Sequence, residues 1–128
     1  MTKLADMSVT EAASKAIEIL LVSERYPVEE IMEEFGEDDS LDSDSAWSEI
    51  KYSRGDEKTV DGLTAKVVAE YGGEGQGDDY WVVISLSDGE LTRYFRRDGW
   101  YASYDGGYLD GETYEVKPVE KLVTFYEQ

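Results

Sequence analysis

Between residues 29 and 49 the chain carries ten carboxylates and no basic side chain. Carboxylates at this density can ligate a hard cation such as calcium, or their summed charge can attract a basic protein. They can also form a merely solvated acidic face. Nine of them make up a predicted partner-binding site, the predicted acidic site: Glu29, Glu30, Glu33, Glu34, Glu37, Asp38, Asp39, Asp42 and Asp44.

The cation hypothesis can be compared with the calcium loop of the EF-hand, which spaces oxygen ligands along about twelve residues. With Asp38 at the first position, Asp42 falls at the fifth and Glu49 at the twelfth. The sixth position holds Ser43, where the sharp turn of that loop requires glycine. We therefore expect no metal site and no cofactor, and favour hypotheses in which the carboxylates meet a protein.

A second constellation lies between residues 93 and 108, where three of the five arginines stand among aromatic residues. Arginine beside stacking aromatic rings is typical of interaction hot spots, and equally of a twisted hairpin whose rings pair across strands. The candidate partner-binding residues of this alternative site are Arg93, Arg96, Arg97, Trp100, Tyr101 and Tyr104.

Composition narrows the class of function. The chain has no histidine and no cysteine, which removes the commonest general base and the thiol nucleophile, so we expect a non-enzymatic protein. Thirty acidic residues against twelve basic ones give a net charge of −18, well beyond the magnitude of about 2–8 that suffices for solubility. Such a field repels nucleic acid and anionic membranes, and attracts basic proteins. Adaptation to salt is a further explanation, although seven of the twelve basic residues are lysine, which salt-adapted surfaces usually lack.

Two helices are predicted to position the first acidic residues. Ser8 and Glu11 have the spacing of a capping box, and the apolar residues that follow recur at helical spacing until near Glu24. The stripe comprises Val9, Ala12, Ala13, Ala16, Ile17, Leu20 and Leu21. Pro27 suits the first turn of a second, shorter helix, and Gly36 is expected to end it in a left-handed cap. The buried stripe of this second helix would comprise Val28, Ile31, Met32 and Phe35.

Residues 37–46 are predicted to form a loop, and residues 53–62 a second polar connection. The segment between them, residues 47–52, could be a helix or a strand. From Leu63 the pattern changes to a period of two, with Ala65, Val67, Ala69 and Tyr71 expected on one face of a strand.

Residues 80–86 predict a strand that ends in a turn at Asp88–Gly89, and a second turn is expected at Asp98–Gly99. Residues 114–118 and 121–127 supply further strand candidates. We therefore expect a single α+β domain over residues 1–128. Its helical acidic part spans residues 7–52, and residues 63–128 form an antiparallel, strongly twisted meander or small open barrel of four to five strands.

Three stretches carry a resemblance: YGGEGQGDDYW, RYFRRDGWYASYDG and EVKPVEKLVTFYE. Together they span about residues 64–127, half of the chain, and resemble a β-module in small acidic bacteriophage proteins of unknown function. The resemblance implies a phage accessory product and brings no catalytic residues with it.

These observations lead to two functional hypotheses. The first is a phage protein that binds a basic host protein through its acidic surface as a DNA mimic, inhibiting a nucleic-acid-binding or defence protein. The second is an interaction or structural module that uses the arginine–aromatic hairpin, with acidity serving solubility only. Because Lys15 and Glu18 interrupt the apolar residues near the amino terminus, we expect no signal peptide and a location in the host cytoplasm, away from the membrane.

Overall fold

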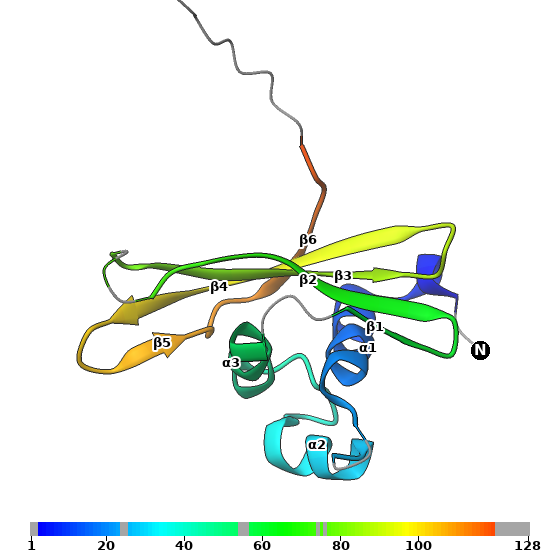
Figure 1. The fold of residues 1–128 in the computed structure, drawn as a ribbon, viewed down its shortest axis with the longest axis horizontal. Helices are drawn as coiled ribbons and strands as arrows, with labels where there is room; N and C mark the ends of the chain where they lie inside the picture. The colour runs from blue at the N-terminus through cyan, green and yellow to red at the C-terminus, as the bar shows by residue number, and fades with distance from the viewer. Residues whose placement is uncertain (1–2, 24–25, 54–56, 74, 76, 120–128) are drawn as a thin grey trace, which may run out of the picture.

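The computed structural model describes residues 3–23, 26–53, 57–73, 75 and 77–119, the last two residues of 26–53 by their backbone only. It has three α-helices on one side of an antiparallel sheet (Figure 1). The elements, in chain order, are a 3-10 helix η1 (Leu4–Asp6), α1 (Val9–Leu21), α2 (Val28–Phe35), α3 (Asp44–Ser53), β1 (Glu57–Val60), β2 (Leu63–Tyr71), β3 (Asp79–Ser87), β4 (Thr92–Ala102), β5 (Gly106–Tyr108) and β6 (Thr113–Val116).

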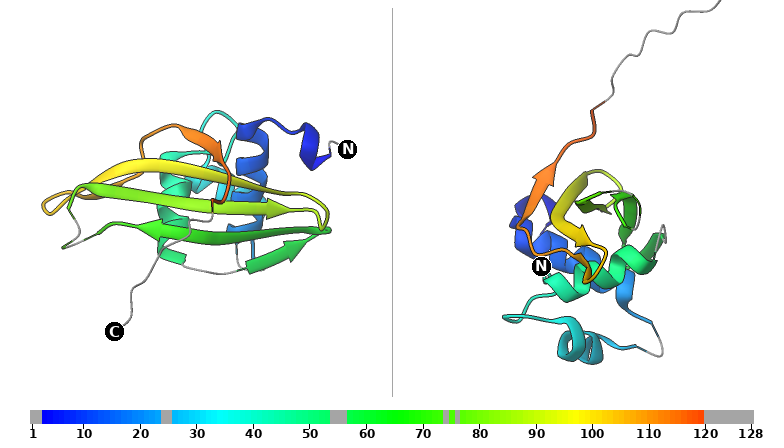
Figure 2. Two further views of the ribbon diagram at one scale, coloured as in Figure 1. Left: turned by 90° about the horizontal axis from the view of Figure 1, so that it is seen from above. Right: turned by 90° about the vertical axis from the view of Figure 1, so that its left-hand side faces the viewer.

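The sheet has the strand order β1-β2-β3-β4-β5, and β6 pairs with β4 beside β5. It curls into a half-barrel whose concave face packs on α1 and α3, while α2 lies farther from the strands (Figure 2). The predicted α+β class and the twisted antiparallel meander are confirmed. The structure adds a third helix and a short first strand to the prediction.

Helix α1 begins as its sequence predicts, because the Ser8 hydroxyl accepts a hydrogen bond from the Glu11 amide at 3.0 Å. It ends at Leu21, three residues before the predicted end near Glu24, and Val22 is already extended. Its buried face carries the predicted apolar stripe and one further residue, Ile19, while Val9 and Leu21 are only partly buried.

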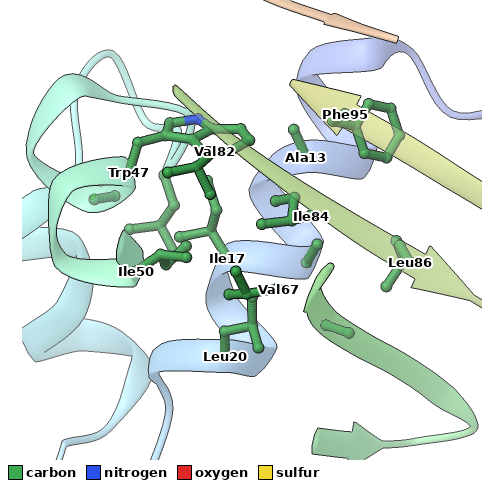
Figure 3. Close-up of a cluster of buried hydrophobic side chains, with 14 of the residues drawn as sticks. Ala13, Ile17, Leu20, Trp47, Ile50, Val67, Val82, Ile84, Leu86 and Phe95 are labelled. Atoms are coloured by element: carbon green, nitrogen blue, oxygen red, sulfur yellow. The ribbon is translucent and has the colours of Figure 1, made fainter. Parts of the chain in front are cut away.

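The core lies between α1, α3 and the concave face of the sheet (Figure 3). Ala13 and Ile17 from α1 and Trp47 from α3 are completely buried in it. Strands β2, β3 and β4 complete the core with Val67, Val82, Ile84, Leu86 and Phe95. Helix α3 therefore supplies the largest core side chain, although sequence periodicity left this segment undecided.

The predicted polar connection over residues 53–62 is wrong for its second half. Residues Glu57–Val60 form β1, which pairs with β2 through a two-residue turn at Asp61–Gly62. Both turn residues have positive φ, 52° for Asp61 and 81° for Gly62, as a right-twisted hairpin turn requires. In the sequence, the aspartate–glycine pair indicates this hairpin turn. The charged residues before it do not have the composition of a strand, so β1 was not predicted.

A bulge in β2 reverses the predicted alternation. The register shifts between Val67 and Ala69, so Ala65 and Val67 are buried, whereas Ala69 and Tyr71 face solvent. Glu70 consequently points to the concave side, where its carboxylate lies 3.9 Å from the ammonium of buried Lys51. The prediction that Ala69 and Tyr71 share one face of the strand with Ala65 and Val67 is therefore wrong.

Of the two predicted hairpin turns, only the one at Asp88–Gly89 exists; it joins β3 to β4, and Gly89 has φ of 97°. The turn at Asp98–Gly99 is wrong, because both residues lie inside β4, opposite Trp81 and Tyr80. Gly99 is needed there for space instead, since a Cβ at this position would lie 1.7 Å from the Tyr108 carbonyl oxygen.

Two predictions for the acidic segment also need correction. Gly36 ends α2 with extended backbone (φ −72°, ψ 149°) and not in a left-handed cap; a Cβ there would lie 2.4 Å from the Met32 carbonyl oxygen. The predicted loop over residues 37–46 ends early, because α3 already begins at Asp44. The predicted strand over residues 121–127 lies outside the described residues.

We expect Gly99→Ala to lower the free energy of unfolding by about 3 kcal/mol, because the new methyl group would force β4 and the chain around Tyr108 apart. Gly89→Ala is the comparison: its Cβ meets open space, and only its positive φ opposes alanine, at about 1–2 kcal/mol. Urea unfolding of both variants measures the difference, and equal losses would contradict a contact at Gly99.

Candidate functional site

Seven of the nine predicted acidic residues form one exposed surface on α2 and the turn after it. Glu29, Glu30, Glu33 and Glu34 lie on the outer side of α2, and the turn adds Glu37, Asp38 and Asp39. We call these seven residues the acidic surface. Within the described part of the chain, no ion pair joins any of them to a basic side chain.

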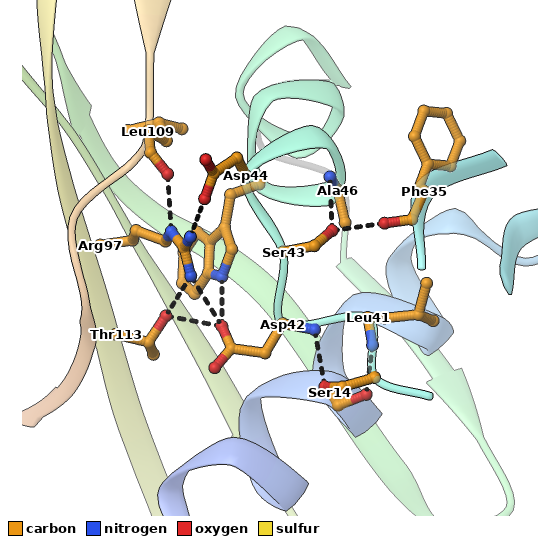
Figure 4. Close-up of polar contacts among 12 residues, drawn as sticks. Ser14, Phe35, Leu41, Asp42, Ser43, Asp44, Ala46, Arg97, Leu109 and Thr113 are labelled. Carbon is orange, nitrogen blue, oxygen red and sulfur yellow. Dashed lines mark hydrogen bonds and ion pairs between the residues drawn. The ribbon is translucent and has the colours of Figure 1, made fainter. Parts of the chain in front are cut away.

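The segment that carries the acidic surface is fixed to the rest of the molecule at several points. Ile31 of α2 is completely buried on the side of the helix that faces the rest of the molecule. The Ser43 hydroxyl donates a hydrogen bond to the Phe35 carbonyl at the end of α2 and accepts one from the Ala46 amide in α3 (Figure 4). The Leu41 amide donates to the Ser14 hydroxyl of α1 at 2.9 Å. The turn itself is closed by two backbone hydrogen bonds between Glu37 and Ser40.

The other two predicted acidic residues have internal partners. The Asp42 side chain is only 9% exposed, and its carboxylate accepts hydrogen bonds from the Trp47 indole at 2.7 Å and the Thr113 hydroxyl at 2.6 Å. Asp44, more than half exposed, accepts a hydrogen bond from the Arg97 guanidinium. These two carboxylates therefore belong to the contact between the helices and the sheet, and not to the acidic surface.

Arg97 stands at the centre of that contact (Figure 4). Its guanidinium is buried and reaches both Asp42, at 3.4 Å, and Asp44. The same group donates to the Leu109 carbonyl at 2.7 Å and to the Thr113 hydroxyl at 3.2 Å. We call Arg97, Asp42, Asp44 and Thr113 the interlayer cluster. It joins one arginine of the predicted hairpin site to two residues of the predicted acidic site.

The calcium-loop pattern does not form a loop in this fold. Its seventh position, Asp44, is the first residue of α3, and Asp42 is surrounded by donors from Trp47, Thr113 and Arg97. Among the residues that the structure describes, no three acidic side chains are grouped so that they could hold a metal ion.

The predicted hairpin residues point to both sides of β4. Arg93 faces inward: its guanidinium donates to the carbonyls of Leu4 and Met7, each at 2.8 Å, and pairs with Glu115 at 2.7 Å. The hydrogen bond from Arg93 lowers the pKa of Glu115 below its usual value. Arg93 thus ties η1 and the residue that follows it to the sheet.

Arg96 lies on the opposite, outer face of the sheet. Its guanidinium stacks over the Trp81 ring at 4.4 Å and pairs with Asp98 at 2.8 Å. Asp98 also accepts a hydrogen bond from the Tyr114 hydroxyl, and the Tyr71 ring stacks on Trp81 with centroids 6.0 Å apart. Burial, together with the hydrogen bond to Asp98, raises the pKa of the Tyr114 hydroxyl.

The aromatic members of the hairpin site divide in the same way. Trp100 is partly exposed, stacks on Tyr108 at 4.7 Å and donates to Asp110. Tyr104 is fully exposed in the turn before β5. Tyr101 is half-buried and stacks on Tyr80 at 5.9 Å. Of the six predicted hairpin residues, Arg96, Trp100 and Tyr104 thus face solvent, whereas Arg93, Arg97 and Tyr101 stabilise the fold.

Sequence reasoning missed three residues of the outer face, Tyr71, Trp81 and Tyr114. Alternation along β3 could have found Trp81, because its neighbours Tyr80 and Val82 are buried.

A hollow of about 480 Å³ beside α2 was also missed; Tyr26 and three glutamates of the acidic surface line it. No sequence signal pointed to that hollow, since the pairing of Tyr26 with Phe35 depends on how the chain turns into α2.

Comparison with protein-family models, with curated proteins and with solved structures gives no match to this chain. Among the described residues, every helix is too short or too polar to cross a membrane. Functional inference therefore depends on the geometry of the two exposed surfaces.

We expect Arg97→Met to lower the free energy of unfolding by about 3–5 kcal/mol, because it leaves the buried Asp42 carboxylate without its counter-charge. Arg96→Met is the matched control: this neighbouring arginine is one-third exposed, and its loss should cost about 1 kcal/mol or less. Chemical unfolding measures both values. Equal losses would show that the interlayer cluster contributes no more than a surface pair.

Glu115→Gln should destabilise the protein at neutral pH and not in acid. Because the folded-state pKa of Glu115 is lowered from 4.5, its pairing with Arg93 stabilises the fold above that pH and is lost as the pH falls through the lowered value. The effect should stay below about 1 kcal/mol, since the carboxylate is 38% exposed. Urea titrations at neutral pH and well below pH 4 measure it, and a pH-independent difference would contradict this assignment.

Proposed function

We propose that the chain is a non-enzymatic bacteriophage accessory protein that binds a basic host protein through its acidic surface. The host protein would be one that binds nucleic acid or acts in defence, and the acidic surface would inhibit it by taking the place of DNA. The observation that carries this proposal is the set of seven exposed carboxylates that have no basic partner in the described part of the chain.

Repulsion within the acidic surface supports selection for a partner. Glu29 and Glu33, like Glu30 and Glu34, are like charges four residues apart on α2, and each such pair costs a helix about 0.2–0.5 kcal/mol. Some carboxylates on the sheet, by contrast, have cationic partners, as Glu115 and Asp98 do. A basic surface that covers α2 would relieve this repulsion on binding.

The geometry of α2 is compatible with DNA mimicry. Residues four apart on a helix are separated by about 6 Å along its axis, close to the spacing of about 7 Å between successive phosphates of one DNA strand. Glu29–Glu33 and Glu30–Glu34 supply two such steps. Glu37 does not continue the series, because α2 ends at Phe35 and Glu37 lies in the turn.

The remaining parts of the proposal rest on the sequence. The phage origin follows from the resemblance over residues 64–127, and the host cytoplasm is where such a product would meet its target. The absence of histidine and cysteine from the chain favours a binding role over catalysis.

A second candidate function uses the outer face of the sheet. This face carries Arg96 stacked on Trp81, together with the partly exposed rings of Tyr71, Trp100 and Tyr114. Exposed aromatic and arginine side chains of this kind are enriched at protein-binding hot spots. On this hypothesis the arginine–aromatic residues bind the partner, and the acidic surface only keeps the protein soluble.

We expect the variant Glu29→Gln/Glu30→Gln/Glu33→Gln/Glu34→Gln to bind the host partner about 10–100-fold more weakly than the wild type, since it removes four exposed charges. The partner is captured from host lysate with the wild-type protein, identified and purified, and its affinity is then measured by isothermal titration calorimetry. Affinity for the wild type should fall steeply as salt rises, and duplex DNA should compete for the same partner surface.

The control variant is Arg96→Ala/Trp100→Ala, which alters the outer face and leaves the acidic surface intact. Under the leading proposal it binds the partner as the wild type does. If this variant loses binding while the glutamine variant binds fully, the acidic surface is not the binding site, and the second candidate function is established. Binding that is insensitive to salt would also refute the leading proposal.

A further inference from the structure

A second concave feature lies along the polar side of α1. It is a groove of about 630 Å³ between α1, the turn after α2, and the β1–β2 hairpin. Glu11, Ser14, Lys15 and Glu18 line it from one side of the helix, since residues three and four apart share a face. The opposite walls are residues 39–40 and the hairpin residues Asp61 and Leu63.

The walls of this groove are held in place by contacts already described. The carbonyl of Met7, at one end, accepts a hydrogen bond from Arg93 of β4. The turn after α2 is tied to Ser14 through the Leu41 amide. The third wall is the tight Asp61–Gly62 turn, whose two residues have positive φ. Because these walls need little ordering, binding in the groove would lose little conformational entropy.

The chemistry of the groove combines apolar surface with negative charge. Met7 and Leu63 are partly buried against the core and contribute apolar surface to the groove. Among the described residues that line it, Glu11, Glu18, Asp39 and Asp61 carry carboxylates, and Lys15 carries an ammonium. That ammonium is itself bound by Glu18 at 2.8 Å, so the described lining of the groove is negative.

We infer that this groove receives a segment of the basic partner in which one aliphatic side chain stands between arginines or lysines. The aliphatic side chain contacts Met7 and Leu63, and the flanking cations meet the carboxylates of Asp39 and Asp61. The inference rests on the proposed function, because Asp39 belongs both to the acidic surface and to the groove. It adds an apolar anchor that charge attraction alone does not provide.

Two fluorescein-labelled peptides test the anchor, Arg-Arg-Leu-Arg-Arg and Arg-Arg-Gly-Arg-Arg, with binding followed by fluorescence anisotropy at low salt. The wild-type protein should bind the leucine peptide about tenfold more tightly, as expected for partial burial of a leucine side chain. Leu63→Thr should bring the two affinities close together, and its thermal unfolding is measured to verify that it folds. Equal affinities for the wild type would overturn the inference without any variant.

The charges are tested with Asp39→Asn/Asp61→Asn, because asparagine tolerates positive φ and preserves both turns. This variant should bind the leucine peptide about fivefold more weakly. The matched control, Asp105→Asn/Glu112→Gln, removes the same charge from exposed residues outside the groove and should change the affinity less than about twofold. Equal losses in the two variants would overturn the inference.

The fourfold glutamine variant of α2 separates this inference from the proposed function. It should bind both peptides more weakly and keep the preference for leucine, because the groove is intact. If the preference for leucine disappears, the anchor lies on α2 and the groove proposal fails. If instead this variant binds the host partner as tightly as the wild type, the proposed function fails, and a preserved preference for leucine would still support the groove.

Discussion

The buried guanidinium of Arg97 is the contact on which the arrangement of this protein depends. It lies on β4, and it binds two carboxylates that flank the start of α3, together with the Leu109 carbonyl and Thr113 after β5. A buried charge is costly unless partners surround it, so these segments are constrained to meet at one point. The carboxylates of Asp42 and Asp44 supply the negative charge that the Arg97 guanidinium requires. Their charge is part of the architecture, whereas the charge of the acidic surface has no such internal use in the described part of the chain.

Local signals in the sequence predicted those parts of the fold that local interactions determine. The helix cap at Ser8, the buried stripe of α1 and the turn at Asp88–Gly89 each depend on residues close in sequence, and all three are confirmed. The predictions failed where distant contacts decide. Asp98–Gly99 has the composition of a turn, yet Gly99 is there because the backbone at Tyr108 passes close to it. The early start of α3 and the bulge in β2 likewise depend on tertiary packing.

The same distinction applies to the candidate sites. That the glutamates of α2 face outward follows from helical periodicity around the buried Ile31, so the sequence could predict it. That Arg93 and Arg97 point inward while Arg96 points outward follows from the alternation of β4, but only once the face covered by the helices is known. The acidic surface and the outer aromatic face end up on opposite sides of the molecule, with α1 and α3 between α2 and the strands (Figure 1). Either surface could therefore be occupied without obstructing the other.

The edges of the sheet bear on how the protein behaves at high concentration. In the described part of the chain, one edge begins with β1, four residues long, whose Lys58 side chain is bound to the Val22 carbonyl. Beyond β1 this edge continues along the second half of β2, where a bulge between Val67 and Ala69 interrupts the regular strand. The other edge is divided between β5 and β6, of three and four residues, with Leu109–Glu112 between them. Short, interrupted or lysine-bearing edges are poor templates for strand addition, which is how flat sheets recruit further chains into fibrils. A molecule rich in tyrosine and tryptophan on an open sheet face is thereby protected from self-assembly at its margins, independently of the electrostatic repulsion between its copies.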